Sequence, residues 1–111
     1  MERLTPCELA IMQIIWKYKA DIPEVNIKLQ LSELSHKDYA RTTIATFLKN
    51  LENKGYLEKY HVGRHSYVHA LIPARDYARE QLGAMLELYY DGNKDHLIED
   101  IATVHWQANE Q

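Results

Sequence analysis

The chain has 111 residues with ordinary hydrophobic (46%) and charged (26%) fractions, which allows one domain or one with a short appendage and excludes fibrous and disordered proteins. Its single cysteine, Cys7, excludes an intramolecular disulfide, and no apolar run approaches the roughly 18 residues of a membrane span, so we expect a soluble, cytoplasmic protein without membrane insertion. The net charge of −3 divides unevenly: residues 1–72 hold ten Lys and Arg against eight Asp and Glu, whereas residues 73–111 hold three against eight.

A first helix is predicted from about Pro6 to Tyr18. Thr5 and Glu8 have the spacing of a capping box, in which each side chain accepts a hydrogen bond from the backbone amide of the other, and Pro6 suits the first helical turn. Apolar residues recur at helical spacing and should form the buried stripe of this helix: Leu9, Met12, Ile15 and Trp16.

A second helix is predicted from about Pro23 to Leu34. Its apolar residues alternate along the sequence at positions 25, 27, 29 and 31, a pattern that would equally fit a strand. The length of the segment and the proline at its start favour the helix.

The third helix is predicted from about Arg41 to Lys54, with Gly55 as its terminator. Apolar residues fall at the spacing of one buried face: Ile44, Phe47, Leu48 and Leu51. Two segments rich in Tyr and Val, residues 57–62 and 66–71, flank Gly63-Arg64-His65 and predict a tight antiparallel hairpin.

Pro73 opens a fourth predicted helix that runs to about Tyr90, and a fifth follows from about Lys94 to Ala108. We therefore predict a mainly α protein with a small β-hairpin. Residues 1–72 form a winged helix-turn-helix domain that binds DNA, and residues 73–111 form a two-helix C-terminal dimerisation region. The same scaffold also serves in protein–protein modules, so the exposed chemistry must decide the function.

The face of the third helix opposite its apolar stripe carries hydroxyl and amide side chains and no carboxylate. Thr and Asn can contact base edges, and Arg and Lys suit phosphate or guanine. Residues 36–69 also hold six basic residues against three acidic ones. The candidate DNA-binding residues on the helix and at the hairpin tip are Arg41, Thr42, Thr43, Thr46, Lys49, Asn50, Arg64 and His65. The alternative is a solvated helix face, although exposed Thr and Asn are poor helix formers.

His61, His65 and His69 have a spacing that would align three metal ligands on a helix. In a hairpin that turns at residues 63–64, His61 would instead face Ser66 and His69 would face Glu58, so the rings separate. We expect no metal site and no cofactor. No nucleophile elbow, phosphate-binding glycine loop or paired-carboxylate motif occurs, so we also expect no catalytic residue and no enzyme.

The predicted fourth and fifth helices each carry an apolar stripe. Two short helices have too little surface to bury both stripes, and a second copy of the chain can cover them. The alternative is that both stripes fold back on their own subunit. The candidate dimerisation residues are Leu82, Met85, Leu86, Tyr89, Leu97, Ile101 and Val104.

A set of short motifs spread over about residues 4–72 carries a family resemblance. The motifs are Leu4-Thr5-Pro6 with Glu8, Ile11-Met12 through Trp16, Thr43-Ile44, Thr46-Phe47-Leu48, Leu51, Lys54-Gly55-Tyr56-Leu57 and Gly63-Arg64. As a set they resemble the penicillinase-repressor family of bacterial transcriptional regulators, which includes the methicillin-resistance repressors and copper-responsive repressors.

The resemblance implies a winged-helix repressor that dimerises through C-terminal helices and binds a dyad-symmetric operator in duplex DNA. Thr43 and Thr46 match the recognition-helix threonines of the family, whereas Asn50 stands where an Arg is common. The copper-responsive members carry C-terminal cysteine pairs, which are absent here. In the β-lactam-responsive members a membrane protease sensor leads to repressor cleavage, which makes a signalling protease a candidate partner.

The sequence therefore predicts a homodimeric, sequence-specific DNA-binding repressor, with its third helix in the major groove and its hairpin on the adjacent backbone or minor groove. The alternatives are a winged-helix protein-interaction module that does not bind DNA, and a DNA-binding activator or chromosome-associated factor. The basic helix face without carboxylates favours DNA, because a protein partner would favour an apolar patch there.

Overall fold

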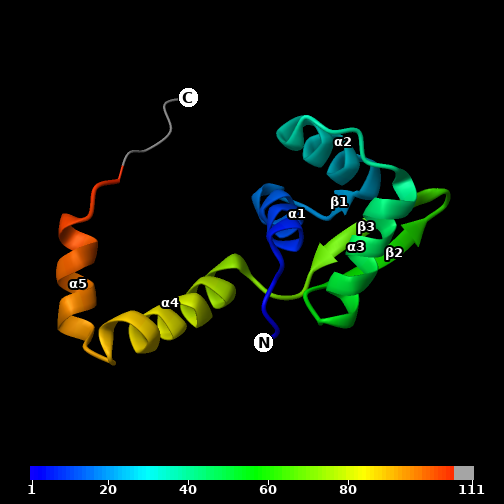
Figure 1. Cartoon of the computed structure of the whole chain (residues 1–111). Helices are drawn as coiled ribbons and strands as arrows, with labels where there is room; N and C mark the ends of the chain where they lie inside the picture. The colour runs from blue at the N-terminus through cyan, green and yellow to red at the C-terminus, as the bar shows by residue number, and fades with distance from the viewer. Residues whose placement is uncertain (107–111) are drawn as a thin grey trace. The chain divides into compact units, whose positions relative to one another are not determined.

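The computed structural model describes residues 1–106 and divides into two compact units, residues 1–76 and the residues from Tyr77 onward. Figure 1 shows the elements in chain order. The first unit contains α1 (Pro6–Lys17), β1 (Ile22–Pro23), α2 (Glu24–Ser35), α3 (Arg41–Asn53), β2 (Leu57–Val62) and β3 (His65–Ala70). The elements that follow are α4 (Ala74–Tyr90) and α5 (Lys94–Thr103). The predicted mainly α fold with a β-hairpin wing is confirmed.

The capping box at the start of α1 forms as predicted. Glu8 N donates to Thr5 Oγ1 at 3.3 Å, and Thr5 N donates to Glu8 Oε1 at 2.9 Å. The predicted buried stripe is partly wrong, because Leu9 and Trp16 are only half-buried while Ile11 and Ile14 are buried. The reason is that α1 packs against α2, α3 and β3 together, so its buried sector is wider than one stripe.

Trp16 lies at the rim of this core for a polar reason. Its indole Nε1 donates to the carbonyl oxygen of Ile72 at 2.9 Å. An indole N–H that is partly removed from water needs a partner, and the carbonyl of Ile72 supplies it.

The segment after Pro23 is the predicted helix, and the strand alternative is wrong. The structure adds a two-residue strand, β1, that the sequence pattern did not reveal: Ile22 pairs with Val68 and Pro23 with Tyr67. A strand this short has no periodicity to detect, and proline is tolerated because β1 lies at the edge of the sheet. α2 then ends at Ser35, and its C-cap residue, His36, adopts a left-handed conformation with φ of 52°.

α3 forms with the predicted start, and its last helical residue, Asn53, is one position before the predicted end. Ile44, Leu48 and Leu51 are buried. Phe47 is only half-buried and meets the ring of Tyr39 edge to face, with 6.4 Å between the ring centroids. Gly55 follows the C-cap with φ of 84°, a conformation that glycine adopts without strain.

The hairpin has a tighter turn than the sequence suggested. The second strand begins at His65 and not at residue 66, so the turn consists of Gly63 and Arg64 alone. Gly63 has φ of 61°, as the first central position of a type II′ turn requires. His61 lies opposite Ser66 and Glu58 opposite His69, which confirms the predicted cross-strand placement.

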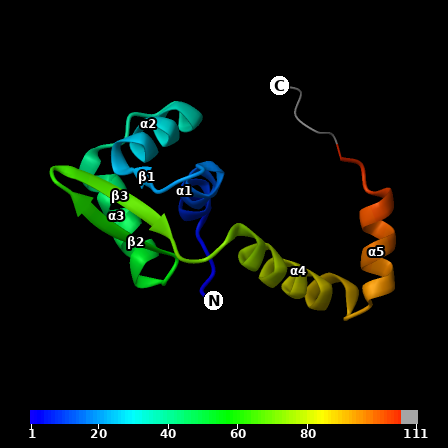
Figure 2. The ribbon, with the colours of Figure 1, turned by 180° about the vertical axis from the view of Figure 1, so that it is seen from behind.

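The three-stranded sheet has the order β1-β3-β2, which the view in Figure 2 shows from behind. Residues directly opposite each other share a face. Leu57, Val68 and Ile22 point to the core and are buried, whereas the other face carries exposed side chains such as Tyr60 and His69. One face of the sheet therefore closes the core, and the other is solvated.

The two C-terminal helices bury far fewer side chains than the elements of the first unit do. Tyr77 is the only buried residue of α4, and α5 has none. Asp91 and Gly92, with φ of 50° and 77°, form the turn between the helices, and Asn93 caps α5 by accepting from His96 N at 3.1 Å. α5 ends at Thr103, so its predicted extension was wrong up to residue 106, and the predicted end at Ala108 lies outside the described residues.

Within residues 1–106, no helix is both long enough and apolar enough to cross a membrane.

Candidate nucleic-acid interface

The outward face of α3 presents the side chains that the sequence assigns to DNA. All six are exposed: Arg41, Thr42, Thr43, Thr46, Lys49 and Asn50. The one acidic residue of the helix, Glu52, accepts a hydrogen bond from the backbone N–H of Lys59 at 3.4 Å. The face thus combines methyl, hydroxyl, amide and basic groups, which are the groups that contact base edges and phosphates.

Thr46 uses its hydroxyl proton inside the helix. Its Oγ1 donates to the carbonyl oxygen of Thr42 at 3.0 Å, a bond that helical threonines commonly make. The methyl group and the oxygen lone pairs remain for a partner. Thr46 can therefore contact a thymine methyl or accept from a base amino group, and it does so without offering a proton.

The basic side chains of residues 36–69 differ in whether they have an acidic partner. Lys54 pairs with Glu8 at 2.6 Å and Lys59 pairs with Glu24 at 2.9 Å. Within residues 1–106, Arg41, Lys49 and Arg64 have no ion pair. The charge count of the segment 36–69 from the sequence did not distinguish among its six basic residues. In the structure, two of the six have acidic partners within the protein.

The first turn of α3 adds a further attraction for anions. The N-cap residue, Ala40, has no side chain that can accept from the first amides, and the turn contains no acidic residue. Backbone N–H groups at a helix N-terminus and the positive end of the helix dipole favour phosphate. Arg41 lies in this turn, so its charge and the dipole act on the same region.

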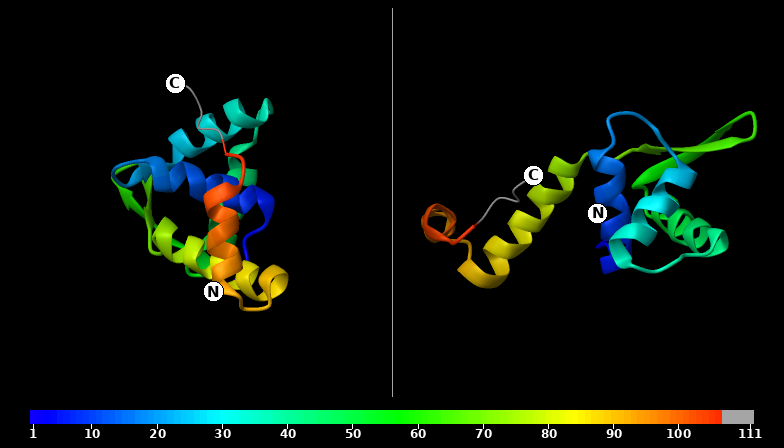
Figure 3. Two further views of the ribbon diagram at one scale, coloured as in Figure 1. Left: turned by 90° about the vertical axis from the view of Figure 1, so that its left-hand side faces the viewer. Right: turned by 90° about the horizontal axis from the view of Figure 1, so that it is seen from above.

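The hairpin turn projects beyond the helices of the first unit, as the right-hand view of Figure 3 shows. Gly63 and Arg64 form the turn, and His65 is the first residue of β3. All three are exposed. Arg64 is therefore free to reach a phosphate or a narrow minor groove, as the sequence predicted for a wing tip.

The solvated face of the sheet holds a polar cluster that the sequence did not predict. Tyr60 donates to Asp21 Oδ2 at 2.6 Å, and His69 Nδ1 lies 2.7 Å from Asp21 Oδ1. The hydrogen bond from Tyr60, followed by that from His69, lowers the pKa of the Asp21 carboxyl. The hydrogen bond to Asp21 raises the pKa of His69. Asp21 precedes β1, so the undetected strand also hid this cluster.

The three histidines are not gathered as metal ligands. His61 lies on the core-side face of the hairpin, His65 and His69 lie on the other, and His69 is bonded to Asp21. In the part of the chain that the structure describes, no group of three or more His, Cys, Asp or Glu side chains could hold a metal ion.

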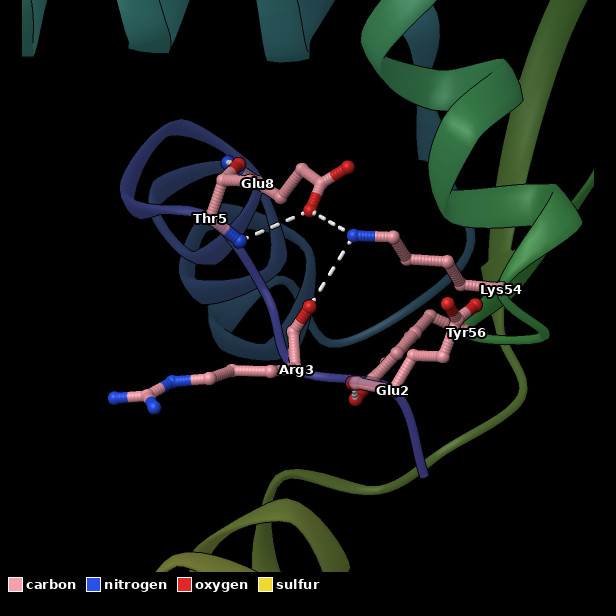
Figure 4. Close-up of polar contacts among 6 residues, drawn as sticks. All are labelled: Glu2, Arg3, Thr5, Glu8, Lys54 and Tyr56. Atoms are coloured by element: carbon pink, nitrogen blue, oxygen red, sulfur yellow. Dashed lines mark hydrogen bonds and ion pairs between the residues drawn. The ribbon is translucent and has the colours of Figure 1, made fainter.

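A second polar cluster lies at the C-terminal end of α3 (Figure 4). Lys54 Nζ donates to Glu8 Oε1 at 2.6 Å and to the carbonyl oxygen of Arg3 at 3.2 Å. Burial raises the pKa of Glu8, but the hydrogen bonds from Lys54 and Thr5 and the lysine charge outweigh it, so the pKa lies below its ordinary value. The sequence showed Glu8 only as a helix cap and Lys54 only as a helix end.

The candidate dimerisation residues on α4, on α5 and at the C-cap of α5 are exposed or half-buried. Leu82, Met85, Tyr89, Ile101 and Val104 are exposed, and Leu86 and Leu97 are half-buried. Tyr90 donates to Asp100 at 2.8 Å and links the two helices. Two helices held at a fixed turn thus present apolar side chains that the described residues leave open.

Comparison with known proteins adds independent findings. A model of the penicillinase repressor family matches residues 4–111. No curated protein gives a significant match. Among solved structures, one of RosR from H. salinarum, described as grown from NaBr, aligns with a TM-score of 0.62. The alignment covers 93% of this chain and 98% of that one, at 18% identity.

Two complexes, hsRosR-S4 and hsRosR-S1, align with TM-scores of 0.62 and 0.61, both at 18% identity. They cover 94% and 92% of this chain and 95% and 96% of theirs. At this identity the likeness concerns the winged-helix fold alone. The family match is more informative, since it extends from residue 4 to residue 111, whereas the motifs read from the sequence ended near residue 72. This chain is a DNA-binding transcriptional repressor and not an enzyme, and it belongs to the penicillinase repressor family.

Proposed function

We propose that the protein acts as a homodimeric, sequence-specific repressor. α3 lies in the major groove of a dyad-symmetric operator, and the hairpin turn lies on the adjacent backbone or minor groove. The observation that carries the proposal is the outward face of α3, which is polar, basic and without carboxylates, with two cations that no acidic residue of the described chain neutralises. An interaction module for proteins would instead need an apolar patch on this face.

The contacts divide by their chemistry. Asn50 is suited to a bidentate contact with adenine. Thr43 is suited to a thymine methyl group or to a base donor or acceptor, and Thr46 to a thymine methyl group or a base donor. Arg41 and Lys49 are suited to phosphate or guanine, and Arg64 and His65 to the backbone beside the groove. The amides and threonines therefore set sequence preference, while the cations supply most of the affinity.

Dimerisation is supported by the apolar side chains of α4 and α5. Monomeric proteins rarely leave a contiguous apolar surface of this kind in water. A second copy related by a two-fold axis would cover the same residues on both subunits. Two recognition helices would then reach half-sites about 34–36 Å apart, one turn of the double helix.

Repression follows from occupancy, because a protein bound across an operator excludes polymerase from the same DNA. A signalling protease as partner and a bacterial source stay predictions that rest on the sequence resemblance, and a cytoplasmic location stays a prediction that rests on the single cysteine and the absence of a long apolar run. None of these three predictions changes how α3 and the hairpin contact the operator.

Salt dependence of binding tests the proposal most directly. The operator is first selected from random duplex DNA with the full chain, and its affinity is then measured across ionic strength. About six to ten phosphate contacts per dimer should give a slope of log K against log salt between roughly −5 and −9. An affinity indifferent to salt would refute the DNA-binding interface and promote the alternative, a winged-helix module that binds protein.

A further inference from the structure

Lys54 is the residue directly after the end of α3, and its ammonium group contacts other parts of the protein. Its Nζ donates to Glu8 Oε1 at 2.6 Å and to the backbone carbonyl of Arg3 at 3.2 Å (Figure 4). The side chains of Lys54 and Glu8 are only 21% and 5% exposed. An ion pair this well shielded is screened little by salt, and it has a defined geometry.

The same oxygen of Glu8 also serves the start of α1. It accepts the backbone N–H of Thr5 at 2.9 Å, and the hydroxyl of Tyr56, two residues after Lys54, donates to the carbonyl of Glu2. The end of α3 is therefore bonded both to the first turn of α1 and to the backbone of the segment that precedes it. Figure 4 shows these groups converging on one place.

The remainder of α3 is held in a different way. Ile44, Leu48 and Leu51 bury its inner face. Within residues 1–106, the side-chain hydrogen bonds and ion pairs that link the helix and its cap to other elements involve Glu52 and Lys54, at the C-terminal end. Apolar contacts are not directional, so they resist separation of the helix more than a small change in its tilt. The ion pair between Lys54 and Glu8 has a defined geometry and therefore opposes a change in the tilt of α3.

Small changes in tilt are large at the other end of the helix. Thr43 lies eleven residues before Lys54, which is about 16 Å along an α-helix. A tilt of about 5° about the Lys54 end would move Thr43 by about 1.4 Å, whereas binding groups must be held to within about 0.5 Å of their productive positions.

We propose that the Lys54–Glu8 ion pair is a positioning device for DNA recognition, which fixes the orientation of α3 and so sets sequence specificity without contact to DNA by either residue. The inference rests on the proposed function, because it assumes that α3 reads bases. It assigns Lys54 to specificity and not to the pool of cations that bind phosphate.

The test removes the pair without leaving a lone buried charge. In the full chain, Glu8→Gln keeps a carbonyl oxygen for the amide of Thr5, and Lys54→Met keeps the length of the side chain. The matched control is Glu24→Gln with Lys59→Met, which removes an ion pair of 2.9 Å with side chains 21% and 28% exposed. That pair links the start of α2 to β2 and involves no side chain of α3.

The readout is the ratio of affinities for the selected operator and for a scrambled duplex, measured well below the unfolding temperature of every variant. We expect the Glu8/Lys54 double variant to lose about tenfold or more in this ratio, a loss comparable to a mismatched base pair. Its affinity for scrambled DNA and its salt slope should stay near those of the unaltered protein. The control should keep the ratio.

An unchanged ratio in the double variant, or an equal loss in the control, would overturn the proposal. If the double variant does not fold, Glu8→Gln alone keeps both the cap and the lysine, and it should lower the ratio in the same direction by a smaller factor; an unchanged ratio there is equally decisive. Failure of the unaltered protein to bind DNA with salt dependence would refute the proposed function instead, so the two failures are distinguishable.

Discussion

The first unit and the two C-terminal helices differ in how many of their apolar side chains are buried. In the first unit, fourteen aliphatic and aromatic side chains from the N-terminal segment, the three helices, the sheet and its flanking residues are buried. Of α4 and α5, only Tyr77 is buried, while side chains such as Leu88, Tyr89 and Ile101 are exposed. The first unit therefore has a core of its own, and the C-terminal helices have an apolar surface that needs a cover.

The distribution of charged residues also differs between the first unit and the C-terminal helices. The acidic excess lies in residues 73–111, and the unpaired cations Arg41, Lys49 and Arg64 lie in the first unit. Acidic helices oppose phosphate, and screening limits that effect to about 8 Å at physiological salt. The difference supports the proposal that contact with DNA and contact with a second subunit fall to different parts of one short chain.

Equivalent substitutions in the two regions should have very different effects. Leu48 is 1% exposed and Leu82 is 45% exposed. Leu48→Ala should lower the free energy of unfolding by about 2–5 kcal/mol, because it leaves a cavity in a closed core. Leu82→Ala should change it little at concentrations where the chain is monomeric, and should instead weaken self-association.

Chemical denaturation and sedimentation velocity measure the two effects. A loss of more than about 2 kcal/mol for Leu82→Ala in the monomer would show that α4 is packed on its own subunit. The comparison between the regions would then fail.

Removal of the C-terminal helices should separate folding from operator affinity. A chain that ends after Asp76 keeps the buried residues of the first unit and should still unfold cooperatively. It should be monomeric and bind the operator about 100-fold more weakly or worse, because two linked sites gain about 10²–10⁴ in avidity over one. Sedimentation and operator titration against the full chain measure this, and undiminished operator affinity would contradict the dimer.

Much of this fold was predictable from local signals. The Thr5–Glu8 capping box, the spacing of Ile44, Leu48 and Leu51, and Gly63 in the turn each specify their structure within a few residues of sequence. β1 was not predictable, since Ile22 and Pro23 form a strand only because β3 lies beside them. The end of α5 was overestimated because the apolar pattern continues through Val104 and Trp106 after the helix has stopped.

The site was predictable to the extent that one helix carries it. Helical spacing places Thr42, Thr46 and Lys49 on the side opposite the core, and the structure has them exposed. The partners of Lys54 and Lys59 were not predictable, because Glu8 and Glu24 lie 46 and 35 positions away in sequence. Which cations remain for DNA is thus a property of the tertiary fold.

DNA contact should belong to the first unit alone, which three alanine substitutions can test. Thr46→Ala should relax base preference at one position of each half-site by about 1–3 kcal/mol. Arg64→Ala should weaken all sequences nearly alike and reduce the salt slope by about one per subunit. Lys94→Ala, on exposed α5, is the control and should leave both properties unchanged.

Repeated selection from random duplexes and salt titration give the two readouts. An unchanged selected motif for Thr46→Ala would place the recognition face elsewhere. A reduced salt slope for Lys94→Ala would extend the interface to the acidic helices and contradict the division of roles.

The smallest effect concerns pH, because the first unit holds a hydrogen-bonded pair, Asp21 and His69, whose pKa values are shifted in opposite directions. Asp21 raises the pKa of His69 by hydrogen bonding, and Glu58, the cross-strand partner of His69, acts in the same direction. Protonated His69 therefore favours the folded state at acidic pH, and this contribution is lost as pH rises through the raised pKa. Asp21, whose pKa is lowered by Tyr60 and then His69, loses its contribution only as pH falls through that lowered value.

His69→Gln should thus lower the Tm at about pH 5.5 and change it less at about pH 9. Tyr90→Phe, which removes the bond to Asp100, should have an equal effect at both pH values. A His69→Gln effect that is equal at both pH values would show that the pair with Asp21 contributes no charge-dependent stability.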